Sequence, residues 1–218
     1  MDHDFAELQR SYDEVSEEYA DRIFTELEFK PLDRELLNRF AANMKGRGVA
    51  CDMGCGPGQV ARYLHDRGVR VVGVDLSPGM IEVARRLNPG IEFFRDNLMS
   101  LDVGNDAWAG IAAFYCIIHI PRPLVVSALN ELRRVLQPGG LLLISFHKGD
   151  GVVHKDEWWG KPVNFDAFFF ERHEMEAYLA SANFEIEEVI ERPPYEGVEY
   201  DSHRVYIFAR KPAFEDIS

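Results

Sequence analysis

Three glycines, each separated from the next by one residue, begin three positions after a short apolar run, and this pattern constrains the fold more than any other part of the sequence. The run covers residues 49–51, and residues 52–58 then read Asp-Met-Gly-Cys-Gly-Pro-Gly. Glycine adopts backbone conformations that other residues avoid, and its missing side chain lets a ligand approach the main chain. The pattern predicts a buried strand, a tight turn beside a ligand site, and a helix over residues 59–66.

Further apolar runs continue this alternation of strand and helix. They are short and continuous, and they cover residues 69–74, 91–94, 111–115 and 141–146. Helical periodicity appears between them, over residues 78–87 and from about Pro123 onward. Continuous apolar strands that alternate with helices form parallel sheets covered on both faces, so we predict an α/β fold with a doubly wound, Rossmann-like sheet.

The two ends of the chain have different patterns. Residues 5–45 are helical in pattern, with a break at Pro31 between two helices. Residues 147–170 are predicted to be rich in loops, and a helix is expected over residues 173–181. Two strands, over residues 184–191 and 204–209, are expected to close the chain.

The charge balance excludes several classes of partner. Asp and Glu number 37 against 24 Lys and Arg, a formal net charge of −13. Such a surface repels nucleic acids and anionic membranes. No apolar run approaches the roughly 20 residues of a membrane span, and the acidic N-terminus is not typical of a signal peptide. The three cysteines lack CxxC spacing, so we expect no disulfide framework or zinc ribbon and a cytoplasmic protein.

Other uses of the glycine turn fit the residues less well. A dinucleotide site of the G-x-G-x-x-G type requires glycine where Gln59 stands, and no Gly-Lys-Ser/Thr follows to make a phosphate-binding loop. A plain strand-to-helix turn without a ligand is the remaining alternative. Three closely spaced glycines behind an acidic residue are costly for such a turn.

Four motifs in order resemble the class I S-adenosylmethionine-dependent methyltransferases, and they lean toward the small-molecule group that includes the ubiquinone and menaquinone methyltransferases. They cover residues 52–58, 72–80, 94–98 and 136–140. The resemblance implies a seven-stranded sheet with the last strand antiparallel, a helical N-terminal cap and a lid after strand five. We therefore expect a single domain, with the cap in residues 1–45, the cofactor-binding core in 46–146, and the acceptor lid with the last two strands in 147–218.

The resemblance also assigns cofactor contacts. Asp75 would accept the ribose hydroxyls, Asp96 the adenine amino group, and Leu76 and Met80 would sandwich the adenine. The alternatives for these residues are a helix cap, a turn acid and plain core, in that order. The complete predicted set for S-adenosylmethionine, or its product S-adenosylhomocysteine, is Tyr12, Tyr19, Asp52, Gly54, Cys55, Gly56, Gln59, Asp75, Leu76, Ser77, Met80, Asp96, Asn97, Leu98, Tyr115 and Cys116.

Methyl transfer is an in-line displacement, in which the protein supplies alignment and a dry pocket. A base is required only for a protonated acceptor. The candidates are His119, after the fourth strand, and His147, at the end of the fifth, and a satisfied core histidine is the alternative for His119. His147, His154, Asp156 and Glu157 match no standard metal spacing, so no metal is predicted.

The aromatic segment after strand five is the predicted acceptor site. A hydrophobic plug or a dimer surface is the alternative. The predicted acceptor residues are His147, His154, Trp158, Trp159, Phe168, Phe170, Tyr200 and Arg204.

The sequence thus predicts a methyltransferase (EC 2.1.1.-) that acts on a small-molecule acceptor. The alternatives are a non-catalytic S-adenosylmethionine-binding or partner-binding module, a protein methyltransferase attracted to basic substrates, and a nicotinamide-dependent oxidoreductase. The acceptor atom and the oligomeric state stay open, since a fold does not determine its substrate.

Overall fold

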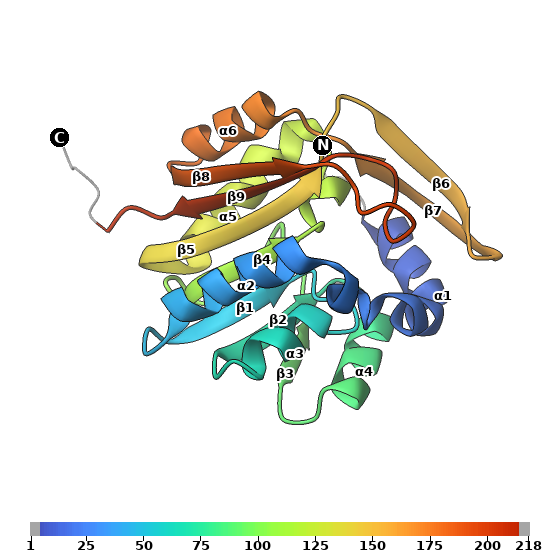
Figure 1. Ribbon diagram of the computed structural model, residues 1–218, viewed down its shortest axis with the longest axis horizontal. Helices are drawn as coiled ribbons and strands as arrows, with labels where there is room; N and C mark the ends of the chain where they lie inside the picture. Colours follow the sequence, from blue (N-terminus) through green and yellow to red (C-terminus); the bar gives the residue numbers. More distant parts are fainter. Residues whose placement is uncertain (1–4, 214–218) are drawn as a thin grey trace.

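A computed structural model describes residues 5–213, and a seven-stranded sheet forms its centre (Figure 1). The strands lie in the order β3-β2-β1-β4-β5-β9-β8. Their bounds are β1 Val49–Met53, β2 Arg70–Asp75, β3 Glu92–Arg95, β4 Trp108–Phe114, β5 Leu136–His147, β8 Glu185–Arg192 and β9 Arg204–Arg210.

Strand direction confirms the predicted topology. The pairs within β3-β2-β1-β4-β5 are all parallel, whereas β9 is antiparallel to both β5 and β8. The last strand is therefore inserted between β5 and β8 in the opposite direction to the rest. The carboxyl ends of the five parallel strands share one edge, where open α/β sheets bind ligands.

Helices cover both faces of the sheet (Figure 1). The helices α2, α3 and α4 pack on one face, and α5 and α6 pack on the other. Strand β5 shows the reason: Leu141 and Leu143 belong to the first core, and Leu142 and Ile144 to the second, because side chains alternate along a strand. The bounds are α2 Pro31–Met44, α3 Gln59–His65, α4 Pro78–Leu87, α5 Val125–Val135 and α6 Arg172–Ser181.

The segment after β5 differs from its prediction. Residues 147–170 were expected to be rich in loops, but β6 (Val152–Trp158) and β7 (Lys161–Phe168) form a separate antiparallel hairpin. Trp159 and Gly160 turn it, both with positive φ, as a type I′ hairpin loop requires. The prediction was wrong because β6 has little apolar alternation and Trp-Gly is not a typical hairpin turn.

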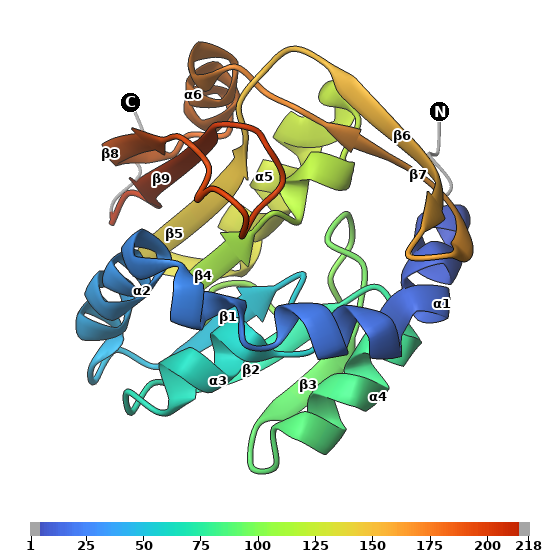
Figure 2. The same ribbon diagram turned by 45° about the vertical axis from the view of Figure 1, so that its right-hand side comes forward.

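The hairpin lies against the first helix, α1 (Ala6–Ile23), on the carboxyl-edge side of the sheet (Figures 1 and 2). Val15 of α1 packs with Val163 and Phe165 of β7 in a small core of their own. Short 3-10 turns complete the chain, namely η1 Glu26–Phe29, η2 Ile117–His119 and η3 Arg122–Leu124. No helix within residues 5–213 is long and apolar enough to cross a membrane.

Candidate functional site

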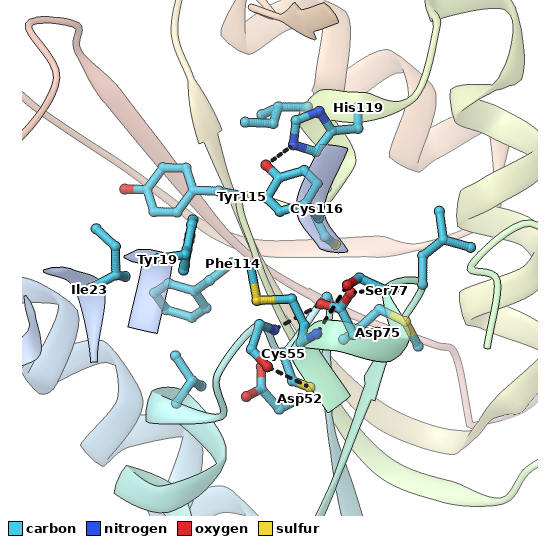
Figure 3. Close-up of a pocket in the computed structure, with 18 of the residues that line it drawn as sticks. Tyr19, Ile23, Asp52, Cys55, Asp75, Ser77, Phe114, Tyr115, Cys116 and His119 are labelled. Atoms are coloured by element: carbon cyan, nitrogen blue, oxygen red, sulfur yellow. Dashed lines mark hydrogen bonds between the residues drawn. The ribbon is translucent and has the colours of Figure 1, made fainter. Parts of the chain in front are cut away.

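A cavity of about 320 Å³ lies at the carboxyl ends of β1, β2 and β4 and is covered by α1 (Figure 3). Residues from both predicted caps and from the core line it. Those named in the sequence analysis that line it are Tyr12, Tyr19, Asp52, Gly54, Cys55, Gly56, Gln59, Asp75, Leu76, Ser77, Met80, Asp96, Asn97, Leu98, Tyr115, Cys116, His119, His147, Trp158, Tyr200 and Arg204.

The glycines of the turn serve two different purposes. A Cβ on Gly54 would lie 2.4 Å from the Cβ of Cys116, so Gly54 lets the tips of β1 and β4 pack closely. A Cβ on Gly56 would meet only Tyr19 Cε1, at 3.7 Å. Both glycines have positive φ. Gly56 therefore leaves open backbone at the cavity wall, as a closely approaching ligand requires.

Asp52 supports the turn from behind. Its Oδ2 accepts a hydrogen bond from the amide of Ala61 at 2.8 Å, within the first turn of α3. Burial raises the pKa of Asp52 to about 7. A carboxylate held in this way satisfies an otherwise unpaired amide at a helix N-terminus. Asp52 lines the cavity, and the one side-chain hydrogen bond that it makes within residues 5–213 holds the turn.

Asp75 joins the glycine turn to the start of α4. Its Oδ2 accepts from the amide of Gly56 at 2.8 Å, and its Oδ1 accepts from the amide of Ser77 at 2.9 Å (Figure 3). Burial raises the pKa of Asp75, whereas these two hydrogen bonds oppose the shift. Each carboxylate oxygen still has a second acceptor site. Asp75 can therefore hold the turn and accept hydroxyl groups from a ligand.

The N-terminal helix is attached at the same place. Ser77 caps α4 by accepting from the amide of Met80, and its hydroxyl donates to Asp13 Oδ1 at 2.6 Å. The amide of Gly79 donates to the same oxygen at 2.9 Å. Asp13 of α1 thus accepts two hydrogen bonds from the start of α4, and this contact closes the cavity on this side.

The loop after β3 forms the next part of the wall. Asp96 accepts from the amides of Asn97 and Asp102, both at 2.8 Å, so its carboxylate shapes this loop as a turn acid does. Leu76 and Met80 lie on the adjoining wall, with Met80 fully buried. The wall is apolar on one side and presents carboxylate oxygens on the other, which suits a flat base with polar edges.

His119 is held between both caps. Its Nδ1–H donates to the backbone carbonyl of Asp166 in β7 at 3.1 Å, because a carbonyl only accepts. Its Nε2 therefore accepts from the hydroxyl of Tyr12 in α1, at 2.7 Å. Burial lowers the pKa of His119 to about 4. Both ring nitrogens have partners, so His119 connects α1 and β7 across the cavity mouth, and taking a proton at Nε2 requires the Tyr12 hydroxyl to stop donating to it.

His147 presents a free nitrogen instead. Its Nδ1 bonds to the hydroxyl of Ser202 at 2.7 Å, and its Nε2 makes no hydrogen bond to any residue in the described part of the chain. The ring lies between those of Tyr115 and Phe169, each at 5.1 Å between centroids. Burial, and then the nearby cation of Arg204, lower the pKa of His147 to about 3. The imidazole is thus neutral, with one edge available to the cavity.

Tyr115 follows the tip of β4 in a left-handed conformation, with φ +55°. Such conformations are rare for bulky residues and cluster at functional sites. Its hydroxyl lies 3.3 Å from that of Tyr206. Burial raises the pKa of Tyr115 to about 12.

Glu26 and Lys30 form a charged wall that the sequence did not predict. Lys30 Nζ lies 2.5 Å from Glu26 Oε2 and 3.3 Å from Glu199 Oε1, and all three residues line the cavity. Glu26 Oε1 also accepts from Gln59 Nε2 at 3.1 Å. Glu26 and Lys30 are one helical turn apart and match no motif, and Gln59 and Glu199 are distant from them in the sequence, so only the fold could bring this pair into the cavity.

Four predicted acceptor residues do not line the cavity. His154 is exposed and pairs with Asp166 at 2.8 Å. Trp159 stacks on Trp158 beside the cavity, with its rings under Arg22. Phe168 lines a smaller neighbouring pocket, and Phe170 is fully buried in the main core. Side chains on β6 and β7 point alternately to the two faces of the hairpin, and Phe170 is buried in the main core. Trp158 is therefore the one aromatic residue from this segment, among those predicted to bind the acceptor, that lines the cavity.

Comparison with known proteins agrees with this geometry. Residues 50–140 match the model of a family described as "Methyltransferase domain". The matched segment, residues 50–140, contains the glycine turn, Asp75, Asp96 and the tip of β4, which form the floor of the cavity.

Two curated relatives match over part of their length. A malonyl-acyl-carrier-protein O-methyltransferase of Enterobacter lignolyticus is 28% identical over 134 residues, covering 59% of this chain and 51% of the relative. A demethylmenaquinone methyltransferase of Clavibacter sepedonicus is 32% identical over 143 residues, covering 63% and 57%. The chain thus spans about half the length of these relatives.

Solved structures share the fold of the matched segment and of the elements around it. A SAM-dependent methyltransferase from Methanosarcina mazei superposes with a TM-score of 0.71 at 20% identity, covering 80% of this chain and 98% of that one. The cyclase SpnF superposes with a TM-score of 0.61 at 20% identity, covering 83% and 81%. The fold is therefore shared by proteins whose names state different reactions.

The caps lie outside the matched residues. α1, η1, the β6–β7 hairpin and the segment with Glu199 and Arg204 all precede residue 50 or follow residue 140. The matched residues thus supply the floor of the cavity, and the flanking segments supply its roof and its charged end.

Proposed function

We propose that the protein is an S-adenosylmethionine-dependent methyltransferase whose acceptor is a small molecule. The observation that carries the proposal is the joint position of Asp75 and the open backbone at Gly56, at the carboxyl edge of a methyltransferase domain. The names of the two curated relatives and of the Methanosarcina mazei structure support the same chemistry.

The charged wall fits the amino-acid end of this cofactor. Gln59 Oε1 is buried and has no hydrogen-bond partner in the described part of the chain, which leaves an acceptor for an ammonium group. Glu26 and Lys30 offer opposite charges beside it. A zwitterion with one ammonium and one carboxylate complements such a pair. We expect Glu26 and Gln59 to contact the ammonium and Lys30 the carboxylate.

The remaining cofactor contacts follow from the wall. Asp75 would accept the ribose hydroxyls, and the loop at Asp96 and Asn97 would contact the edge of the adenine. When bound, the cofactor supplies an electrophilic methyl group on a sulfonium. The protein aligns the acceptor and excludes water, and the α1 and hairpin covers, joined through His119, serve that exclusion.

The two histidines predicted as bases differ in whether a ring nitrogen is open to the acceptor. His147 Nε2 is without a hydrogen bond, whereas both nitrogens of His119 have partners. We therefore favour His147 over His119 as the base for a protonated acceptor, in the tautomer whose Nδ1–H donates to Ser202 Oγ and leaves Nε2 as the acceptor. The low pKa of His147, about 3, keeps it neutral and able to accept at neutral pH, although it limits how strongly it holds the proton.

Enclosure favours a small acceptor. The cavity lies beneath α1 and beside the hairpin, and the formal charge of −13 disfavours a nucleic acid. The superposition on SpnF, which is named a cyclase, provides a reason to keep a second function: a protein of this fold that binds the cofactor without methylating a substrate.

Two alanine variants test the cofactor site. Gly56→Ala places a methyl group at the cavity wall, and Gly68→Ala introduces the same left-handed strain where a Cβ meets nothing within 4 Å. We expect Gly56→Ala to weaken S-adenosylhomocysteine binding at least ~10-fold by calorimetry, about 1.4 kcal/mol, and Gly68→Ala to leave it unchanged. Equal binding by both variants would remove the turn from the site, and no binding by the native chain at millimolar ligand would refute the proposal.

Turnover separates the two functions. The protein is incubated with S-adenosylmethionine and either the small-molecule or the protein fraction of a cell extract, and S-adenosylhomocysteine is quantified. Formation that requires the small-molecule fraction supports the proposal. Formation that requires the protein fraction indicates a protein methyltransferase, and cofactor binding without turnover in either fraction indicates a non-catalytic protein.

A further inference from the structure

Arg204 lies at the end of the cavity beyond the charged wall. It is the first residue of β9 and pairs in register with His147 of β5, so both side chains project from the same face of the sheet. Both residues line the cavity. The Arg204 side chain is only 3% exposed. A nearly buried guanidinium therefore faces the cavity beside an imidazole.

The hydrogen bonds of Arg204 are incompletely used. Its Nη1 donates to the carbonyl of Ser202 and, at 3.3 Å, to the Ser202 hydroxyl. Its Nε is buried and makes no hydrogen bond within the described residues, and the oxygen of Glu199 nearest to it is 3.5 Å away. Arginine carries five donors in a planar fork that matches a carboxylate. Unused donors on a buried cation are costly, which indicates a missing acceptor.

The neighbouring carboxylate does not fill this role. Both oxygens of Glu199 accept from Arg192, at 2.6 and 2.9 Å, and one also accepts from the amide of Tyr195. Although burial opposes its charge, the hydrogen bonds from Arg192 lead among the contacts that lower the pKa of Glu199 to about 2. Glu199 thus takes its hydrogen bonds from Arg192 and Tyr195, and its ion pair with Arg204, at 3.5 Å from Nε, leaves that Nε–H without a hydrogen bond within the described residues.

The groups around Arg204 describe the rest of a ligand. His147 Nε2 adds a second polar atom that has no hydrogen bond within the described residues, and Ser202 connects the two side chains through one hydroxyl. Tyr115 and Tyr200 place aromatic rings beside them. This end of the cavity contains three cations, Lys30, Arg192 and Arg204, and their charges are balanced by three carboxylates, Glu26, Asp33 and Glu199. Selection of the ligand therefore depends on unfilled hydrogen bonds rather than on the net charge of the site.

We infer that the acceptor is a carboxylic acid with a flat or apolar body, and that Arg204 binds its carboxylate. This inference rests on the proposed function, since it concerns the acceptor end of the same cavity. A carboxylate would accept the unused donors of Arg204, and the aromatic rings would contact the body. Arg204 is then the residue that distinguishes an acid from its neutral analogue.

Benzoate and benzamide test the inference because they share a shape and differ in charge. Each is titrated calorimetrically into the native chain, with and without saturating S-adenosylhomocysteine. A hydrogen bond to a charged group contributes enough for about a tenfold difference or more. We therefore expect benzoate to bind at least ~10-fold more tightly than benzamide. Equal binding, tighter binding of benzamide, or no binding of benzoate would overturn the inference.

Variants locate the preference. Arg204→Gln should reduce the ratio of benzoate affinity to benzamide affinity to near one, while leaving the affinity for S-adenosylhomocysteine unchanged. Arg204→Lys should retain part of the preference for benzoate. Arg172→Gln, which removes a half-exposed arginine on α6, is the control and should behave as the native chain. A preference that persists in Arg204→Gln would overturn the assignment to Arg204. If Arg204→Gln fails to fold, the native-chain comparison and Arg204→Lys still decide.

The two proposals fail in different ways. Loss of cofactor binding by the native chain would refute the methyltransferase, whereas the benzoate titration without cofactor would still report on Arg204. Cofactor binding with no preference for benzoate would refute the acceptor class alone.

Discussion

Acidification should destabilise the native chain through His119, and a His119→Gln variant should escape this effect. The pKa of His119 is lowered to about 4 in the folded protein from an ordinary 6.5. Above pH 6.5 the ring is neutral in both the folded and the unfolded chain, so the pH has no effect through this group. Between pH 6.5 and 4 the unfolded chain takes up a proton that the folded chain excludes, and stability falls.

The magnitude follows from the size of the shift. A fall of roughly 2.5 pH units at about 1.36 kcal/mol per unit gives at most ~3 kcal/mol, because part of the ring faces the cavity. At pH 7 the variant loses the hydrogen bonds to Tyr12 and Asp166, about 1 kcal/mol each. The native chain should therefore be more stable by about 1–2 kcal/mol at pH 7, and the order should reverse near pH 5.

Urea unfolding, followed by tryptophan fluorescence, measures this difference in stability. The titrations are made between pH 7.5 and 4.5, at steps of about half a pH unit. Groups shared by both proteins, such as Asp52 and His147, cancel in the comparison. His173→Gln, on an exposed residue of α6, is the control and should parallel the native chain. A stability difference between native chain and His119→Gln that stays constant across this range would refute the reasoning.

Two further variants examine the attachment of α1 and the packing of the sheet. Asp13→Ala removes the acceptor for the Ser77 hydroxyl, so α1 should exchange amide hydrogens faster and S-adenosylhomocysteine should bind about tenfold more weakly. Asp21→Ala, on the exposed side of α1, is the control and should match the native chain. Equal exchange in the two variants would argue against this attachment of α1. Gly73→Ala brings a Cβ to 2.4 Å from the buried ring of Phe93 and should lower unfolding stability by about 1–3 kcal/mol in urea titrations, and an unchanged midpoint would show that the ring moves aside at little cost.

Local sequence patterns were sufficient for the five parallel strands and for the position of the glycine turn, whereas the antiparallel last strand was predicted from the family resemblance. Continuous apolar runs predicted the five parallel strands to within a few residues at most ends, because fully buried strands need no polar face. β5 is the exception, since it begins at Leu136 instead of near residue 141. The glycine turn, Asp75 and Asp96 lie at strand ends that a parallel sheet brings to one edge, and they line one cavity.

The roof depended on packing between distant segments. The β6–β7 hairpin has little apolar alternation in β6, and it is positioned by contact with α1. His119 was predicted as a base, yet its partners Tyr12 and Asp166 lie 107 and 47 residues away, and no local pattern contains that information. Its role as a base stays a prediction, which the geometry now favours less than that of His147.

The sequence by itself determined the Rossmann-like order of strands and helices and the position of the glycine turn, because these depend on burial and backbone conformation within a few residues. Only the tertiary structure decided that Glu26, Lys30 and Arg204 share a cavity, and that Gly56 rather than Gly54 leaves its backbone open. The physical reason is that a side chain's partners and unfilled hydrogen bonds arise between segments far apart in the chain, where charge and burial are set by the complete fold.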